Sequence, residues 1–429
     1  MIHRLTTLRG LLLAGACSGL LAAAPVAAQQ AAAPAPLPPG SPLIGQPDNE
    51  GAKKLAPVAA PPLATAADKL PLDKLKTAPG FKLEVYASGM PNARTLREGD
   101  KGTVFVSSRL QDKVWAIVDK GGKREVKVVA SGLYRPNGIV FHKGTLYIAE
   151  LSQISKIDKI EDNLDNPPKP TVIYSDLPKD EAHGWKYLIV GPDEKLYFQV
   201  GAPCNICMPD DQHAQIRRID LDGKNPEVVA RGIRQIVGMD FDPVSKMLYW
   251  SENSRDWLSE DIPNDKLNRL SKVGLNYGYP FCHQGNVPDQ EFGWGKKCSD
   301  FEHPIALLGP HAAALGMRFY TGKQFPAEFH DNIVLARHGS WNRSVKFGGD
   351  VVLIKLGKDR LPTDKWDVPG DKRTDIKPIV WGFLQNNSYV GRPVDVMQMK
   401  KDGSMLISDD WNGAVYRLSY GGKQTATMH

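Results

Sequence analysis

Residues 185–205 read WKYLIVGPDEKLYFQVGAPCN, two short apolar β-type runs joined by a Pro-Asp turn and ending in small or polar residues. Runs of this kind on both sides of a turn are typical of a β-hairpin. The same order of apolar entry, β-run, Asp/Gly turn and second β-run recurs in six copies, which begin at Ala93, Pro136, Trp185, Val237, Leu315 and Pro393. The fold class therefore depends on a repeat.

Copies spaced by roughly 45 to 80 residues, each with room for four short strands, predict an all-β protein, a six-bladed β-propeller of four-stranded antiparallel blades. The two longest spacings flank an insertion at residues 256–310. In a propeller the strand-ending loops converge on one face around a central channel. We therefore expect one site to collect the polar residues at equivalent repeat positions, which include His183, Arg234, Gln235, Asn253, His338 and Arg392.

Residues 1–28 resemble a secretory signal peptide, with Arg4 and Arg9 ahead of an apolar run and small residues at its end. We expect cleavage before Gln29 and a periplasmic or secreted protein. A lipoprotein anchor through Cys17 is the less favoured alternative, because the residues before it lack the usual leucine. No later run approaches the length of a transmembrane helix, so we expect no integral membrane span.

Residues 29–78 are rich in Ala and Pro, a composition that cannot bury enough apolar surface to offset its ordering entropy. They predict a flexible segment ahead of a propeller domain at residues 79–422. The net charge of +6 falls to +4 once Arg4 and Arg9 leave with the signal peptide. The lysines are scattered rather than clustered, so nucleic acid is not an expected partner.

Four cysteines remain after export, and an oxidising compartment makes them candidates for disulfides. Three pairings are possible, and we favour Cys204–Cys207 and Cys282–Cys298 because each closes a short local loop. A c-type haem at the C-x-x-C motif would need a histidine where Met208 stands. A zinc site is a further alternative, although the second pair is spaced too widely for a zinc knuckle.

Several motifs, in order along the chain, resemble the glucose/sorbosone dehydrogenase family. They are H-x4-L-x-x-G-P-D-x-K-L-Y at 183–197, RGIRQ ahead of VGMDFDP, GLNYGYP at 274–280, and GRPVDV with DGSMLISDDWNGAVYRLSY near the end. The segments HGSWNRS and RDWLSEDIPNDKLNR are most similar to the L-sorbosone dehydrogenase-like branch. The resemblance covers residues 79–420 and implies a soluble periplasmic quinoprotein that uses pyrroloquinoline quinone and Ca²⁺.

The resemblance implies oxidation of an aldose or a sugar aldehyde such as sorbosone by hydride transfer to the quinone. An unknown periplasmic electron acceptor would reoxidise the cofactor. His183 matches the family's general base, a role for which imidazole has a suitable pKa. Arg234 and Gln235 align with an Arg-Asn pair that contacts the quinone, and Arg392 matches a further cofactor arginine. Planar guanidinium donors suit the three carboxylates of this cofactor.

Val394 stands where the family has a second arginine, so one carboxylate contact must come from elsewhere. The possible replacements are Arg343, Arg94 and His338. Further candidate cofactor contacts are Asn137, His311, His338 and Arg343. Candidates for stacking on a substrate sugar or on the quinone are the aromatic residues Trp257, Trp341 and Tyr389.

In glucose-oxidising members of the family that the chain resembles, calcium binds main-chain carbonyls of an E-H-G-P turn. The corresponding residues here, 252–255, read ENSR. Ser254 and Arg255 are therefore candidate main-chain ligands, with Asn253 or Asp256 as alternatives.

Ala202 stands where some family members have an aspartate that helps to orient the histidine or the substrate. We therefore expect another carboxylate, or the loop between Cys204 and Cys207, to position His183.

Two other functions remain open at this level. Calcium-dependent lactonases of the gluconolactonase type are six-bladed propellers with a PNG signature, found here at 136–138, and Glu150, Asn137 and Asp409 could form their metal site. A non-catalytic propeller that binds a protein or glycan is the third possibility. His183 and the arginines favour the quinoprotein.

Overall fold

The computed structural model describes residues 41, 43–363 and 377–421. The predicted signal peptide at residues 1–28 lies outside the described residues, as do residues 29–40 and 42 of the predicted flexible segment. From residue 43 onward that segment is described, and it carries the short helix α1 (Glu50–Lys53), the 3-10 turn η1 (Ala67–Lys69) and strand β1 (Lys76–Thr77).

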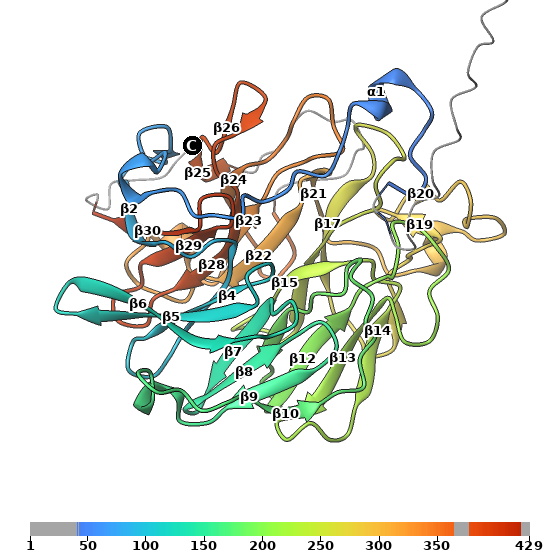
Figure 1. Ribbon diagram of the computed structural model, residues 1–429. Helices are drawn as coiled ribbons and strands as arrows, with labels where there is room; N and C mark the ends of the chain where they lie inside the picture. The colour runs from blue at the N-terminus through green and yellow to red at the C-terminus, as the bar shows by residue number, and fades with distance from the viewer. Residues whose placement is uncertain (1–40, 42, 364–376, 422–429) are drawn as a thin grey trace, which may run out of the picture. The chain divides into compact units, whose positions relative to one another are not determined.

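Six antiparallel sheets follow one another along the chain, which confirms the predicted six-bladed, all-β propeller (Figure 1). The first blade is β3 (Ala93–Glu98), β4 (Val104–Ser108), β5 (Lys113–Lys120) and β6 (Lys123–Ser131). The second is β7 (Gly138–His142), β8 (Thr145–Ala149), β9 (Ile154–Ile157) and β10 (Thr171–Tyr174). The third is β11 (Leu188–Val190), β12 (Lys195–Val200), β13 (Gln215–Asp220) and β14 (Glu227–Arg231).

The second half of the ring contains the insertion and the closure. The fourth blade is β15 (Ile236–Phe241), β16 (Leu248–Glu252), β17 (Asn264–Arg269) and β21 (Ala306–Pro310). The fifth is β22 (Ala314–Phe319), β23 (Ile333–Arg337), β24 (Asp350–Ile354) and β25 (Lys377–Trp381). The sixth is β28 (Pro393–Gln398), β29 (Met405–Asp409), β30 (Ala414–Tyr420) and β2 (Phe81–Ser88).

Short elements decorate this frame. Strand β18 (Leu275–Asn276) pairs in parallel with β14, and β1 pairs with β25, so two blades have a fifth strand. Separate hairpins are β19 (Cys282–His283) with β20 (Val287–Pro288), and β26 (Leu384–Gln385) with β27 (Ser388–Tyr389). The remaining 3-10 turns are η2 (Ile160–Asp162), η3 (Cys298–Asp300) and η4 (Ala327–Phe329).

Alternation along the strands explains how the blades pack. In β4, Val104 and Val106 belong to the apolar cluster shared with the sixth blade, whereas Phe105 packs with Ile139 and Ile148 of the second blade. Because successive side chains of a strand point to opposite faces, one apolar strand can serve two interfaces. Both faces of a blade are therefore buried, which is why the central strands read as nearly continuous apolar runs.

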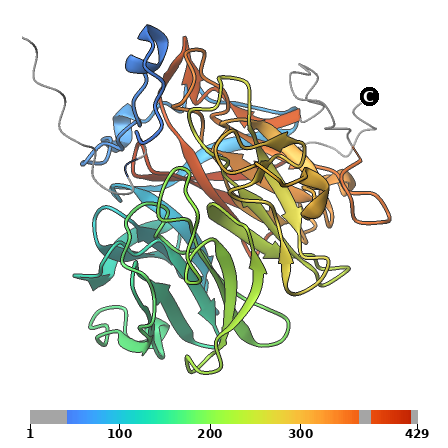
Figure 2. The same cartoon turned by 90° about the vertical axis from the view of Figure 1, so that its right-hand side faces the viewer.

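The ring closes by pairing the two ends of the propeller. Strand β2 runs antiparallel to β30, with Phe81 opposite Tyr420 and Ser88 opposite Ala414, although the two strands lie far apart in sequence. Figure 1 shows β2 beside β30, and Figure 2 shows the blue N-terminal and red C-terminal segments together from the side. The innermost strands β3, β7, β11, β15, β22 and β28 each contact the next, and β28 contacts β3.

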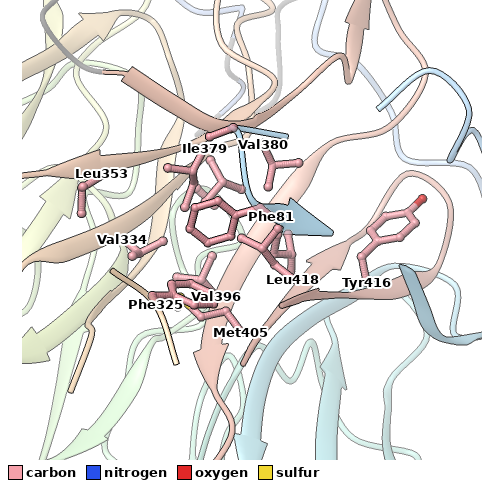
Figure 3. Packing of buried hydrophobic residues seen from close by; sticks show 14 of the residues in the cluster. Phe81, Phe325, Val334, Leu353, Ile379, Val380, Val396, Met405, Tyr416 and Leu418 are labelled. Carbon is pink, nitrogen blue, oxygen red and sulfur yellow. The ribbon is translucent and has the colours of Figure 1, made fainter. Parts of the chain in front are cut away.

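Phe81 anchors this closure in the largest apolar cluster around β2 (Figure 3). Its ring lies edge-on to Phe325 at 4.8 Å between centroids and contacts Phe329 at 5.3 Å and Tyr420 at 5.0 Å. Phe325 and Phe329 belong to the fifth blade's connection, so one side chain joins the closing strand to the neighbouring blade.

Two disulfides form the pairing favoured from the sequence, Cys204 with Cys207 and Cys282 with Cys298. The first follows β12 beside the central channel, and the second ties the inserted hairpin β19–β20 to η3. Across the part of the chain that the structure describes, no helix is long and apolar enough to cross a membrane.

Removing the anchor of the closing strand should destabilise the ring. Phe81→Ala is expected to lower the free energy of unfolding by about 3 to 5 kcal/mol, the usual cost of truncating a buried phenylalanine. Phe81→Leu should lose less, and Lys82→Ala, on the exposed face of the same strand, should change little. Guanidinium unfolding of the three variants measures the effect, and equal stability of the Phe81 and Lys82 variants would contradict the role of Phe81.

Candidate active site

The innermost hairpin of each blade, made of its first two strands, brings residues to one edge of the ring. Its first strand begins where its second strand ends, because the two are antiparallel: Ala93 lies opposite Ser108, and Pro393 opposite Asp409. A residue just before the first strand and one just after the second therefore share an edge. Repeated around the ring, this arrangement brings side chains from separate blades to one mouth of the channel.

A cavity of about 660 Å³ lies at this edge, within the usual range for small-molecule sites. It brings together many of the residues predicted from the sequence, namely His183, Arg234, Gln235, Asn253, Ser254, His311, His338, Trp341 and Arg392. It also contains residues that the sequence analysis did not single out, which include Arg109, Asp180, Glu181, Trp185, Asp265, Asp410 and Trp411.

His183 lies in a turn between β10 and β11, with a left-handed backbone φ of 50°. Its Nδ1 lies 2.9 Å from the main-chain carbonyl of Ala202, to which the ring donates. Nε2 therefore carries the lone pair. Burial, followed by the charge of Arg234, lowers the pKa of His183 from 6.5 to about 3, so the ring is a neutral base at neutral pH.

The contact to Ala202 answers what orients this ring. The sequence predicted another carboxylate or the disulfide loop in place of the missing aspartate, and the structure uses the main-chain oxygen of Ala202, two residues ahead of Cys204. Ala202 itself is held by its N–H, which donates to Arg234 O at 2.8 Å.

The turn around His183 is fixed from behind by Gln235 and Gly201. The Gln235 amide nitrogen donates to His183 O at 2.9 Å, and its oxygen accepts from Trp185 Nε1 at 3.0 Å. A Cβ on Gly201 would come within 2.5 Å of His183 O. Gln235, predicted as a cofactor contact, therefore uses its amide to hold the loop that carries His183.

Arg234 is buried in a network of protein groups. It donates to Asn205 O and Oδ1 at 2.9 Å each and forms an ion pair with Asp256 at 2.9 Å. Its position between β14 and β15, next to the cavity, is that expected from the repeat. Its charge is already paired with an aspartate.

Arg392 has only main-chain and aromatic partners for its guanidinium group. It donates to His338 O at 3.2 Å and Gly339 O at 2.5 Å, and lies 4.8 Å from the centroid of the Tyr389 ring. Burial lowers its pKa from the ordinary value. In the described ranges no carboxylate lies within ion-pair distance of Arg392.

A third charged group joins the first, fifth and sixth blades. Asp410 accepts from His338 Nε2 at 2.8 Å and from Arg94 Nη1 at 2.8 Å. These two partners hold the pKa of Asp410 well below its usual range, although burial opposes the shift. Burial, then the charge of Arg392, lowers the pKa of His338 to about 4, so its ring is neutral beside a charged carboxylate.

Arg109 follows β4 directly and was missed by the sequence analysis. Its guanidinium carbon lies 4.2 Å from the centroid of the Trp185 ring, and its buried Nε has no hydrogen-bond partner. The signal that could have found it is positional, since it occupies the place in the first blade that Asn253 and His338 occupy in the fourth and fifth.

Five predicted residues do not line the cavity. Asn137 accepts from Arg94 and donates to Lys186 O beneath the cavity. Tyr389 lies under Arg392, and Trp257 packs edge-on against Trp341 at 5.2 Å. Arg343 bonds Asp261 in a neighbouring loop, and the Arg255 side chain pairs with Asp289 in the insertion.

The turn predicted to bind calcium through main-chain carbonyls is braced by a buried carboxyl. Asp265 accepts from Ser254 N at 2.9 Å and from Ala314 N at 3.1 Å, and burial raises its pKa to about 7. No group of three or more His, Cys, Asp or Glu side chains within the described residues could hold a metal ion. A main-chain calcium site at Ser254 and Arg255 stays a prediction.

The residues proposed as metal ligands of a lactonase form hydrogen bonds within the propeller framework. Glu150 accepts from Tyr134 N and Gln153, and Asp409 accepts from the backbone N–H of Arg392 and from Asn412. Neither lines the cavity, nor does Asn137.

A family model described as TrAA12-like matches residues 75–421, which contain all six blades and the cavity residues from Arg94 to Trp411. The chain belongs to the TrAA12-like family. An uncharacterized protein of Borreliella burgdorferi is 30% identical over 361 residues, which cover 81% of this chain and 91% of that protein.

A further relative, compared by sequence and by structure, is a sugar dehydrogenase. The pyrroloquinoline quinone-dependent pyranose dehydrogenase of Coprinopsis cinerea is 24% identical over 275 residues, 51% of this chain and 37% of that protein. The holo form of its quinone-binding domain shares the fold, with a TM-score of 0.68 and 20% identity over 80% of this chain and 97% of that chain. The resemblance to soluble quinone-dependent sugar dehydrogenases is confirmed, and the sorbosone branch stays a prediction.

The segment ahead of the propeller also contributes to the cavity of the TrAA12-like protein. Ser41, Pro57, Val58 and Ala60 line it. Nearby, Asn205 Nδ2 donates to Ile44 O at 3.2 Å. The Ala/Pro composition of this segment gives no indication that it lines the cavity.

The His183 ring of the TrAA12-like protein should stay neutral, with its proton on Nδ1, from pH 8 down to pH 5 in the apoprotein, because its pKa is about 3. Long-range ¹H–¹⁵N NMR of ring nitrogens, assigned with His183→Gln, reports both the tautomer and the midpoint. The same histidine in the urea-unfolded chain should titrate near pH 6.5. A folded-state midpoint near 6.5, or a proton on Nε2, would show that the contact to Ala202 does not control the ring.

Proposed function

We propose that this chain is a periplasmic quinoprotein oxidoreductase that oxidises an aldose or a sugar aldehyde, with sorbosone-like aldehydes as the favoured substrates. The observation that carries the proposal is the neutral His183 ring, whose Nδ1 is committed to Ala202 and whose Nε2 is left as a base in a cavity lined by arginines. The family and the pyranose dehydrogenase relative support the same chemistry.

The donor set of the cavity fits pyrroloquinoline quinone, a planar tricarboxylate. Arg392 lines the cavity without a carboxylate partner among the described residues, so its guanidinium can take one from a ligand. Arg234, His311 and His338 complete the polar wall around it. The residues that would hold the cofactor therefore come from the fourth, fifth and sixth blades and their connections.

A bound quinone would supply a two-electron acceptor for hydride from the hydroxyl-bearing carbon of the substrate, which for a sugar aldehyde is the carbon of its hydrate or hemiacetal. His183 takes the proton of that hydroxyl at Nε2, and the contact from Nδ1 to Ala202 O stabilises the imidazolium that forms. The fixed cations of the cavity stabilise the negative charge that develops opposite the base. Since Ala202 holds the ring and Gln235 holds the main chain of His183, little reorganisation accompanies the proton transfer.

Calcium belongs to the proposal as a main-chain site at Ser254 and Arg255, which hard carbonyl oxygens would form with the cofactor. An exported location fits the two disulfides, since such bonds persist in oxidising compartments. A periplasmic electron acceptor would complete the cycle.

The test uses purified apoprotein supplied with pyrroloquinoline quinone and CaCl₂, with reduction of an artificial dye measured across a panel of aldoses and sugar aldehydes. The wild type should reduce dye in a sugar-dependent way. His183→Ala should lower kcat at least about 100-fold, the usual share of a general base.

His142→Ala, at a histidine outside the cavity, is the matched control and should keep full activity. Cofactor binding by His183→Ala, followed by absorbance, separates loss of the base from loss of the site. The proposal fails if the wild type binds no quinone, or if the His183 variant turns over at the wild-type rate.

A further inference from the structure

The four arginines that line the cavity differ in whether the protein already neutralises them. Arg94 pairs with Asp410 at 2.8 Å, and Arg234 pairs with Asp256 at 2.9 Å. Arg109 and Arg392 form no ion pair with any described residue. Arg392 is buried and Arg109 is partly buried. A cation that is shielded from water without a counter-ion is costly, so an anion that enters the cavity gains most from these two groups.

Arg109 has the fewest protein partners of the four. Its guanidinium group stacks on Trp185, its Nε is buried without a partner, and no described residue accepts a hydrogen bond from it. Burial, followed by the nearby charge of Arg94, lowers its pKa to about 9. Two carboxylates that act on Arg109 from a distance are occupied: Asp410 by Arg94 and His338, and Glu181 by Tyr134 and Arg135.

The platform under Arg109 is rigid and connected to the base. Trp185 Nε1 donates to the amide oxygen of Gln235, and the nitrogen of that amide donates to His183 O. Stacking holds the guanidinium plane on the indole while its edge remains available. A planar donor held in this way suits bidentate recognition of a carboxylate.

Val394 explains why a second cation must come from another blade. It is buried with Val237 and Leu315, both of which line the cavity, so this part of the wall is apolar. Arg94 and His338, considered as substitutes from the sequence, are bound to Asp410, and Arg343 bonds Asp261 outside the cavity.

We propose that Arg109, stacked on Trp185, is a carboxylate-binding residue of the cavity and acts with Arg392 to hold two carboxylates of the quinone cofactor. This inference rests on the proposed function for the identity of the ligand. It places one carboxylate contact on the first blade, whereas the insertion belongs to the fourth blade.

The test measures affinity rather than turnover. Titration of apoprotein with pyrroloquinoline quinone, followed by quenching of tryptophan fluorescence, should give a Kd about 10- to 100-fold weaker for Arg109→Gln, the range for a hydrogen-bonded charge. Arg109→Lys should lose less than Arg109→Gln but should not recover wild-type affinity, because it keeps the charge without the fork.

Arg124→Gln is the matched control. Arg124 also stacks on an aromatic ring, at 4.0 Å from the Tyr86 centroid, but its Nε forms an ion pair with Asp119 at 3.7 Å and it lies outside the cavity. Its variant should bind the quinone as the wild type does. Circular dichroism and melting temperature confirm that the compared variants are folded.

The trimethyl ester of the quinone shows whether Arg109 reads a carboxylate. The wild type should prefer the free acid to the ester, and Arg109→Gln should lose about tenfold or more of that preference. An unchanged Kd and unchanged preference in Arg109→Gln would overturn the inference while the proposed activity could still stand. Quinone binding that depends on Arg109 without any sugar oxidation would support the inference and refute the proposed activity.

Discussion

The pairing of β2 with β30 is the interaction on which the arrangement of the site depends. Each blade is a local hairpin repeat, yet the cavity residues are divided among several blades and the connections between them. Closing the ring through β2 covers the edge of β30, completes the sixth blade and keeps the six innermost strands around one channel. Phe81 couples that closure to the fifth blade, so His338, Asp410 and Arg94 meet only in the closed ring.

The periodic part of the structure was predictable from sequence because hairpin periodicity is a local signal. Six similar hairpins imply six blades, and the repeat then places His183, Arg234, His338 and Arg392 at one edge. The partners of these side chains were not predictable, since they come from other blades. Nothing near Asn137 indicates that it supports Arg94 and Lys186 O beneath the cavity, and nothing near Asp410 indicates its contact with His338.

His183 illustrates a limit of residue identity. The sequence shows Ala202 where an aspartate was expected. The missing carboxylate suggests that this position no longer orients His183. In the structure the same position orients the ring through its main-chain oxygen, which any residue supplies. The exchange also changes the electrostatics: a neutral carbonyl does not raise the basicity of the imidazole as a carboxylate would, so burial and Arg234 keep the ring uncharged.

The four cavity arginines differ in whether a carboxylate or an aromatic ring supports the guanidinium group. Asp410 and Asp256 neutralise Arg94 and Arg234, so these two cations brace the walls and fix the positions of His338 and Asn205. Arg109 and Arg392 are held instead by aromatic rings, which orient a guanidinium plane without cancelling its charge. A carboxylate in place of either ring would neutralise the guanidinium group and make the cavity less attractive to an anion. The aromatic supports therefore keep two cations oriented and unneutralised, a local cost that the packed interfaces of the ring can bear.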